Sequence, residues 1–376
     1  MSTFTVYFCG TGSHRFDIAN PSYWNGELVS TLAGNEQGRE FAHWVVIDGP
    51  GSGNLQVDEL FIAANHYGLM GTLFGSGWEQ NVDHALHIIK GHCNWQRKAL
   101  SEHEYDRLKA AGIPIEDVRE TGSWFWRTYD FGQRRVTPQQ LQEQIIKTFR
   151  TDGPLPSQVN LVGWSRGGVS CHMLANAMLN DSDLKALPIN IFAVDPVPGL
   201  LNFQAHRVQL GANVKQYVGF YARDERSRGF SCVIPRTHPS TRCHLYPLPG
   251  RHATLVGNAS ADGTSQGKAL LEPGLIVRHF AEVCLTRWGV QLGNRLELTE
   301  RELQAYHHAM ARDDSEYRAM RDHSYTVITE SQESERCVSI GAEGAAFSRV
   351  SGAMFQPDSG LAAPVGWSSQ AYKDIR

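Results

Sequence analysis

Residues 159–168 read Val-Asn-Leu-Val-Gly-Trp-Ser-Arg-Gly-Gly and constrain the fold of this chain more than any other stretch. The first residues are apolar and β-branched, which is typical of a buried strand, and residues 166–179 carry apolar side chains at helical spacing. A strand that turns directly into a helix imposes strained backbone angles on the residue at the turn, here Ser165. Glycines two positions before and after the serine leave room for neighbouring backbone. The stretch predicts a strand, a sharp turn and a helix, with the Ser165 hydroxyl at the carboxyl edge of a sheet.

Strand and helix patterns alternate along most of the chain. Further strands are expected at 3–9, 44–47, 189–194, 214–222 and 244–248, and helices at 78–89, 137–149, 274–288 and 299–311. Alternation of this kind favours a mainly parallel sheet with helices on both faces. In such sheets, ligands bind at the carboxyl ends of the strands. We therefore expect an α/β fold of the α/β-hydrolase type, with the serine turn at the ligand-binding edge.

The chain divides into a main domain and an extension. We expect residues 1–290 to form the α/β domain, and residues 291–376 to form a helical or irregular extension packed on it, since periodicity weakens from Ser324 onward. Residues 92–136, inserted before the serine strand, mix charged and aromatic side chains. We interpret this insertion either as a lid or substrate wall, or as a surface excursion.

Composition argues against several classes of protein. The formal net charge of -4 argues against general binding of nucleic acid. The seven cysteines are scattered and odd in number, which is typical of a reducing compartment. The first residues show no secretory signal pattern, and no apolar run approaches the roughly 18 residues of a membrane span. We therefore expect a cytoplasmic protein at synthesis, exported, if at all, by a system that needs no signal peptide.

A serine hydroxyl becomes a good nucleophile only when a base removes its proton and an acid orients the base. In α/β-hydrolase folds these residues follow in the order serine, acid, histidine. Asp195 and Asp224 each follow a predicted strand after Ser165, and position alone does not separate them. His252 follows a predicted strand and a Pro-Gly turn, and we expect it in a loop rather than on a helix. The candidate catalytic residues are thus Ser165, His252 and one of the two aspartates.

Other residues near the serine and the histidine have candidate binding roles. The Arg166 amide at the helix start, and an amide of Gly10 or Thr11 in the glycine loop after the first strand, are candidate donors to an oxyanion. Trp164 and Arg251, which neighbour the serine and the histidine in the chain, are candidate substrate-binding residues. The two cysteines and two histidines between positions 232 and 244 fit no recognised zinc spacing. We expect neither a metal nor another cofactor.

Several short motifs in one order carry a family resemblance. They are Cys-Gly-Thr-Gly at 9–12, Ile-Asp-Gly-Pro-Gly-Ser-Gly at 47–53, Gly-Ser-Gly-Trp at 75–78, the serine turn at 163–168, Val-Asp-Pro-Val at 194–197, Ala-Arg-Asp-Glu-Arg at 222–226, and the Pro-Gly-Arg-His segment within 248–257. Together they resemble a large bacterial and fungal family of uncharacterised α/β hydrolases. Known members of that family include type VI secretion phospholipase effectors, the Tle-type lipases.

The resemblance separates the two candidate acids. In the family the acid is the aspartate of a Trp-Asp-Thr-Val motif, which is similar to residues 194–197 and so implies Asp195 rather than Asp224. Two positions depart from the family pattern, because Cys9 replaces an aspartate of the first loop and Asn258 interrupts the last glycine pair.

The resemblance implies a serine esterase that cleaves acyl esters of phospholipids and touches a membrane surface transiently, with a secretion or immunity protein as partner. Six arginines against two acidic residues between positions 223 and 251 favour a phosphate-bearing substrate or an anionic bilayer. Two alternatives stay open. The same chemistry could act on a soluble ester, thioester or amide, or the chain could be a non-catalytic binding module that retains the fold.

Overall fold

The computed structural model describes residues 2–50, 78–91, 119–121, 128–130, 146, 149–150, 155–199, 202–258, 268–323, 335–346, 367 and 371–375. Its centre is a six-stranded sheet in the order β2-β1-β5-β6-β7-β9, and every neighbouring pair in this sheet is parallel. The strands are β1 (Thr3–Phe8), β2 (Trp44–Ile47), β5 (Gln158–Trp164), β6 (Ile189–Val194), β7 (Val214–Ala222) and β9 (Arg242–Leu248). The prediction of an α/β fold built on a parallel sheet is confirmed.

The order of the strands changes direction beside β1. The chain places β2 on one side of β1 and β5 on the other, and then adds β6, β7 and β9 outward from β5. The carboxyl ends of β1 and β5 are level, because Phe8 pairs with Gly163. In open parallel sheets, ligands bind outside the carboxyl ends of the strands at such a switch point. The glycine loop after β1 and the serine turn after β5 both begin there.

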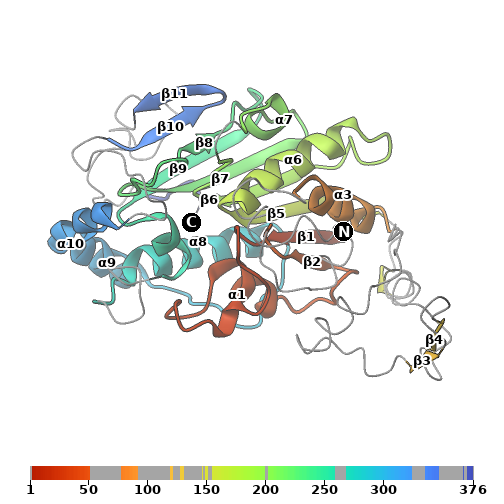
Figure 1. Cartoon of the computed structure of the whole chain (residues 1–376), viewed down its shortest axis with the longest axis horizontal. Coiled ribbons are helices and arrows are strands. Elements are labelled where there is room, and N and C mark those ends of the chain that lie inside the picture. The colour runs from red at the N-terminus through yellow and green to blue at the C-terminus, as the bar shows by residue number, and fades with distance from the viewer. Residues whose placement is uncertain are drawn as a thin grey trace.

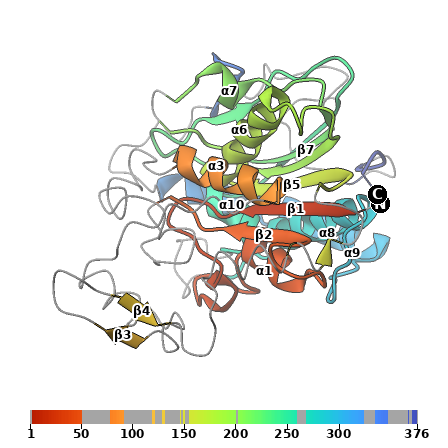
Figure 2. The ribbon, with the colours of Figure 1, turned by 90° about the vertical axis from the view of Figure 1, so that its right-hand side faces the viewer.

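Helices cover both faces of the sheet, as the sequence predicts (Figures 1 and 2). One face carries α3 (Trp78–Ile89), α6 (Arg166–Asn180) and α7 (Ala205–Val208), and the other carries α1 (Leu28–Asn35), α8 (Glu272–Arg287) and α9 (Glu300–Arg312). Alternation within β5 serves both cores, because Leu161 packs in the first and Val162 in the second. A parallel strand buried on both faces reads as a nearly continuous apolar run, which explains why β5 was easy to predict.

Helix α9 begins with a capping box. The Thr299 hydroxyl accepts from the Glu302 amide at 3.3 Å, and the Glu302 carboxylate accepts from the Thr299 amide at 2.7 Å. This reciprocal pair satisfies two backbone donors at the start of the helix. The chain then continues through α10 (Asp314–Ala319) and the short 3-10 helix η5 (Met320–Asp322).

The described part of the C-terminal region differs from the irregular or loosely helical tail that we expected. Strands β10 (Cys337–Ile340) and β11 (Glu343–Ala346) form an antiparallel pair, and β10 also pairs in parallel with β8 (Cys232–Ile234). Strands of three or four residues are too short for their periodicity to be read from sequence.

Two further elements near the N-terminus were not predicted, namely α1 and the 3-10 helix η1 (Asp17–Ala19). Glu27 caps α1, and its carboxylate accepts from the amides of Val29 and Ser30 at 2.9 and 2.8 Å. Glutamate is not among the residues preferred at this position, so the start of α1 carried no recognisable signal.

Parts of the sequence prediction lie outside the described residues. Of the insertion at 92–136, the structure describes only the antiparallel pair β3 (Arg119–Thr121) and β4 (Thr128–Asp130), and most of the helix expected at 137–149 is also outside the description. The lid and the domain boundary at residue 290 stay predictions. Among the described residues, no helix is both long and apolar enough to cross a membrane.

Candidate active site

Ser165 occupies a strained turn between β5 and α6. Its backbone angles are φ 56° and ψ -129°, in the half of the φ range that residues other than glycine rarely adopt. The neighbouring segment holds the turn, because the Ser165 amide donates to the Val194 carbonyl and the Ser165 carbonyl accepts from the Val197 amide, each at 3.1 Å. Strain of this kind persists only where the surrounding structure enforces it, and it clusters at functional sites.

The two glycines that flank the serine are required by close backbone contacts. A Cβ atom on Gly163 would lie 2.3 Å from the Gly167 carbonyl oxygen, and a Cβ atom on Gly167 would lie 2.3 Å from the Phe8 carbonyl oxygen. Backbone atoms cannot move aside as the end of a flexible side chain can. The start of α6 therefore lies directly against the end of β1, and the two loops of the switch point meet.

Asp195 directly follows β6 and lies against His252. Its Oδ2 atom is 2.6 Å from His252 Nδ1, although 57 residues separate the two in the chain. Trp164 pairs with Val194, so Ser165 and Asp195 leave adjacent strands side by side. Asp195 is completely buried and, like the serine, has a positive φ, here 43°. The structure thus brings Asp195 to the histidine and to the strand that ends in the serine.

His252 begins the 3-10 helix η4 (His252–Val256), whereas we expected it in a loop. Its backbone amide donates to the Glu225 carboxylate at 3.2 Å, so the residues after β7 fix the start of η4. Its ring lies between two others, with centroids 5.0 Å from Trp164 and 5.1 Å from Phe230. These contacts, together with the bond to Asp195, hold the imidazole in one orientation.

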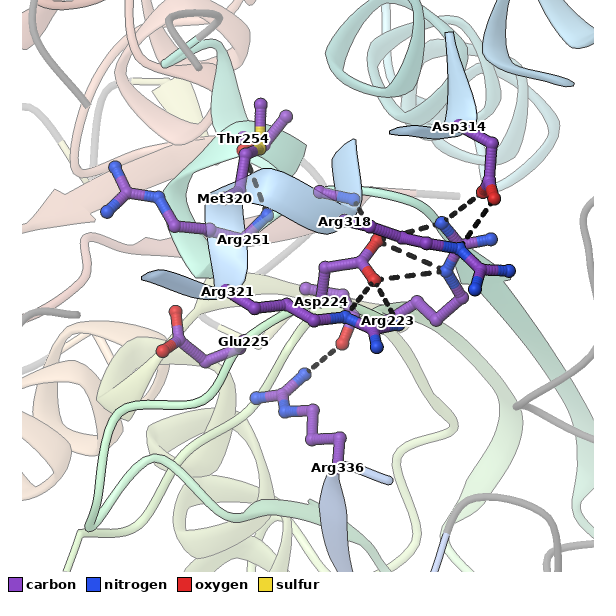
Figure 3. Close-up of polar contacts among 12 residues, drawn as sticks. Arg223, Asp224, Glu225, Arg251, Thr254, Asp314, Arg318, Met320, Arg321 and Arg336 are labelled. Atoms are coloured by element: carbon purple, nitrogen blue, oxygen red, sulfur yellow. Dashed lines mark hydrogen bonds and ion pairs between the residues drawn. The ribbon is translucent and has the colours of Figure 1, made fainter. Parts of the chain in front are cut away.

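Asp224, the alternative acid, is occupied elsewhere. Its carboxylate forms ion pairs with Arg223 at 3.0 Å and Arg321 at 2.7 Å, and it accepts from the Gly250 amide at 3.0 Å. Figure 3 shows both arginines pointing toward this buried carboxylate, with Asp314 completing the group through Arg223. Asp224 therefore ties the turn before His252 to α10 and η5, while Asp195 is the aspartate that meets the histidine.

Arg336, which was not among the predicted site residues, donates hydrogen bonds to Asp195. Its guanidinium donates to both carboxylate oxygens, at 2.5 Å to Oδ1 and 2.8 Å to Oδ2, and the side chain is 2% exposed. Burial alone would raise the pKa of Asp195, but the charge of Arg336 and the bonds from His252 and Arg336 outweigh burial and lower the pKa to about 2. The carboxylate is ionised at neutral pH. No sequence signal marks Arg336, because it is a single arginine 141 residues after Asp195.

The candidate oxyanion donors lie together at the switch point. Arg166 is the first residue of α6, at the positive end of the helix dipole, and its side chain donates to the Thr11 hydroxyl at 3.0 Å. The Gly12 amide is used by the Pro50 carbonyl at 3.2 Å. A Cβ atom on Gly10 would lie 2.3 Å from the Trp164 indole, so the glycine loop after β1 packs directly beside the serine turn.

The two candidate substrate-binding residues are nearly buried. Trp164 is 5% exposed and packs on Gly10 and on the His252 ring. Arg251 is also 5% exposed, and its guanidinium donates to the His323 carbonyl at the end of η5. Both contacts organise the protein itself, and contact of either residue with a substrate stays a prediction.

The six arginines between positions 223 and 251 are divided between the interior and the surface of the protein. Arg223, Arg226 and Arg251 are at most 6% exposed, because Arg223 is paired with acidic residues and Arg226 donates to backbone carbonyls. The number of charged residues can be read from the sequence, but which of them are buried cannot. Within the described ranges, no group of three or more histidine, cysteine or acidic side chains is placed to hold a metal ion.

The sequence matches no protein-family model and no curated protein. Among solved structures, the fold is similar to that of an uncharacterised protein from Pseudomonas aeruginosa, with 13% identity and a TM-score of 0.45 over 84% of this chain and 52% of that one. It is also similar to the Tle1 effector bound to the VgrG spike of the type 6 secretion system, with 13% identity and a TM-score of 0.32 over 68% of this chain and 51% of that one. The chain thus aligns with about half the length of each solved structure.

Proposed function

We propose that this protein is a serine hydrolase that cleaves acyl esters through Ser165, His252 and Asp195. The observation that supports this most is the 2.6 Å contact between His252 Nδ1 and Asp195 Oδ2, formed beside the strained turn of Ser165. An acid at Nδ1 fixes the tautomer in which Nε2 accepts a proton, which is what a serine nucleophile needs from its base.

The proposed reaction has two halves. Ser165 Oγ attacks the acyl carbon while His252 takes the serine proton, and the resulting oxyanion is stabilised by the Arg166 amide and an amide of the Gly10–Thr11 loop. The protonated His252 then gives its proton to the leaving alcohol, which departs and leaves an acyl-enzyme. Water attacks this ester while His252 takes a proton from it, and the protonated His252 then returns the proton to Ser165 Oγ as the acid product departs.

Phospholipid is the substrate that we favour, because apolar side chains are exposed beside the site. Phe16, Ile18 and Trp24 are 55%, 46% and 46% exposed. The Trp24 amide donates to the Gly257 carbonyl at 3.2 Å, which places this segment next to the helix η4 that His252 begins. Aromatic and aliphatic side chains at one surface are suited to a lipid interface.

The test is release of fatty acid from phospholipid vesicles, with a short soluble ester alongside, by the wild type, Ser165→Ala and Ser182→Ala. Ser182 is an exposed serine just beyond α6 and serves as the matched control. We expect release by the wild type and Ser182→Ala, and none by Ser165→Ala. Cleavage of the soluble ester alone would favour a general esterase, thioesterase or amidase, and silence on both substrates from folded protein would favour a binding module.

We also propose, from the motif resemblance alone, that the protein acts as an exported lipase effector with secretion and immunity partners. Directing the wild-type chain to the periplasm of a bacterium should then arrest growth and deplete phospholipid, whereas Ser165→Ala should not. Equal growth of the two strains, at equal amounts of protein, would contradict an effector role without bearing on the esterase chemistry.

A further inference from the structure

Arg336 is held rigidly where it meets Asp195. Besides its two bonds to the carboxylate, the guanidinium donates to the carbonyls of Ala222 at 2.5 Å and Phe230 at 2.9 Å. It stands one residue before β10, whose Val338 pairs with Cys232 of β8. Strands on both sides of the site thus fix the guanidinium, and its planar fork matches the carboxylate geometry.

The hydrogen bonds to the Asp195 carboxylate hold it in one orientation. Oδ1 accepts from Arg336 and from the Ala222 amide at 3.1 Å, and Oδ2 accepts from Arg336 and lies 2.6 Å from His252 Nδ1. Two acceptor positions on each oxygen are thereby occupied. A rotation about the Cβ–Cγ bond would break all of these contacts together, so the plane that points Oδ2 at the imidazole is set in large part by Arg336.

The arginine also changes the charge that His252 meets. Asp195 is the negative group in contact with the ring, Glu225 lies at the backbone of His252, and Cys232 is a buried thiol beside the pair. Burial raises the pKa of the Cys232 thiol well above its usual range, so the thiol stays neutral. Arg336 adds a buried positive charge that partly offsets the negative charge of Asp195, so the net charge that His252 faces depends on Arg336.

We propose that Arg336 is a positioning residue of the site, which aims Asp195 at His252 and makes the reaction depend on the β10 segment. This inference rests on the proposed hydrolase function and deepens it. Arg336 touches neither the reacting atoms nor the proposed substrate, so its effect should fall on kcat and leave KM unchanged.

Kinetics of Arg336→Ala, Arg336→Lys and the matched control Arg236→Ala test this role. Arg236 pairs with Glu343 of β11 on the exposed side of the same small sheet. We expect kcat to fall about 100-fold in Arg336→Ala, the cost of a misplaced catalytic group, with partial recovery when guanidinium ion is added. Arg236→Ala should match the wild type. Equal losses in Arg336→Ala and Arg236→Ala, or an undiminished kcat in Arg336→Ala, would overturn the proposal.

The two substitutions at position 336 separate geometry from charge. Lysine keeps the positive charge but not the two-pronged contact, so Arg336→Lys should lose kcat while the acid limb of its kcat/KM profile stays in place. Arg336→Ala also removes the charge, so its acid limb should move to higher pH. Acid limbs that coincide in all three proteins would contradict the electrostatic part, and a full kcat in Arg336→Lys would contradict the geometric part.

Proton NMR provides a readout that does not depend on turnover. The Nδ1 proton shared by His252 and Asp195 should give a sharp downfield resonance in the wild type, assigned by its absence in His252→Asn. We expect it to persist in Arg236→Ala and Ser165→Ala and to broaden or vanish in folded Arg336→Ala. If the wild type hydrolysed nothing, this signal would still decide the role of Arg336, and an unchanged resonance in Arg336→Ala would overturn it.

Discussion

The rings of Trp164 and His252 lie with their centroids 5.0 Å apart and their planes at 41°. Trp164, the residue before the proposed nucleophile, therefore packs against the ring of the proposed base His252. Because Trp164 ends β5, this contact fixes the position of His252 relative to the strand that leads to Ser165. Because such ring contacts contribute about 0.5–1.5 kcal/mol, we expect Trp164→Ala to lower kcat by up to about tenfold. Trp164→Phe keeps a ring and should lose less, as steady-state kinetics on a soluble ester would show. Equal losses of kcat in the two variants would argue against a role for ring packing between Trp164 and His252.

Replacing each of the two aspartates by asparagine should affect a different property of the protein, namely catalysis at position 195 and stability at position 224. Asp195→Asn should lower kcat by about 10⁴-fold, because the imidazole would be held in the wrong tautomer. Asp224→Asn breaks a buried ion pair and should cost about 3 kcal/mol of stability, with kcat of the folded protein almost unchanged. Denaturant melts and kinetics on the same samples would check both. The reverse pattern would make Asp224 the acid.

A methyl group at Gly167 should be poorly tolerated, because it would lie 2.3 Å from the Phe8 carbonyl oxygen. Overpacking of this kind costs about 1–3 kcal/mol, and the shift of the serine turn should abolish hydrolysis. Gly344→Ala is the matched control, since a Cβ atom there meets nothing within 4 Å. Thermal unfolding should separate the two variants, and a Gly167→Ala protein as stable as Gly344→Ala would refute the close contact.

Glu27 should make the protein less stable as the pH rises toward neutrality. Burial raises the pKa of this carboxyl to about 7, against the opposing effect of the amides that it accepts from. Its folded pKa is above the unfolded value of 4.5, so the stabilisation is complete below about pH 4.5 and is lost by about pH 7, a change of about 3 kcal/mol.

Urea melts at pH 4.5 and 7.5 would test this dependence. Glu27→Gln should lose less stability between the two pH values than the wild type does. Some loss should persist in that variant, because burial also raises the pKa of Glu36 to about 7. Glu297→Gln, at an exposed position, should follow the wild type. A pH dependence that is the same in all three proteins would show that Glu27 is ionised in the folded state without cost.

The exposed apolar side chains near η4 should matter only on lipid. Phe16→Ser and Trp24→Ser should reduce hydrolysis of vesicles while leaving the soluble ester unaffected, because the interface and not the chemistry is changed. Phe149→Ser is the control, since Phe149 is 40% exposed but lines a separate hollow with Gly289 and Pro156. Equal effects on both substrates would point to a folding defect rather than to lost lipid contact.

Much of the fold follows from local patterns in the sequence. The buried strands β5, β6 and β7 are long apolar runs, and the cap of α9 is spelled out by Thr299 and Glu302. The serine turn could be predicted because its close backbone contacts require glycine at positions 163 and 167. Strands β8, β10 and β11 could not be predicted, because they are too short to show a periodic pattern and form only by pairing with one another.

The site was predictable in part for a related reason. Order along the chain and a motif resemblance led to Asp195 and His252, which the structure brings into contact. Arg336 could not be predicted because its partner Asp195 is distant in sequence. The pairing of Arg223 with Asp224 and Asp314 inside the protein could not be predicted either, because a sequence does not show which charges are buried. Burial and long-range pairing are properties of the folded chain, and a count of charges does not contain them.

The contact between Asp195 and Arg336 also has a consequence for biosynthesis. A ribosome adds Ser165, Asp195 and His252 well before it adds Arg336. Strand β8 likewise cannot pair with β10 until that later segment has been made. A nascent chain can therefore carry the serine turn and the histidine while its aspartate still lacks the counter-ion. The counter-ion of Asp195 is thus supplied by a late segment of the chain, and a chain that ended before Arg336 would lack it.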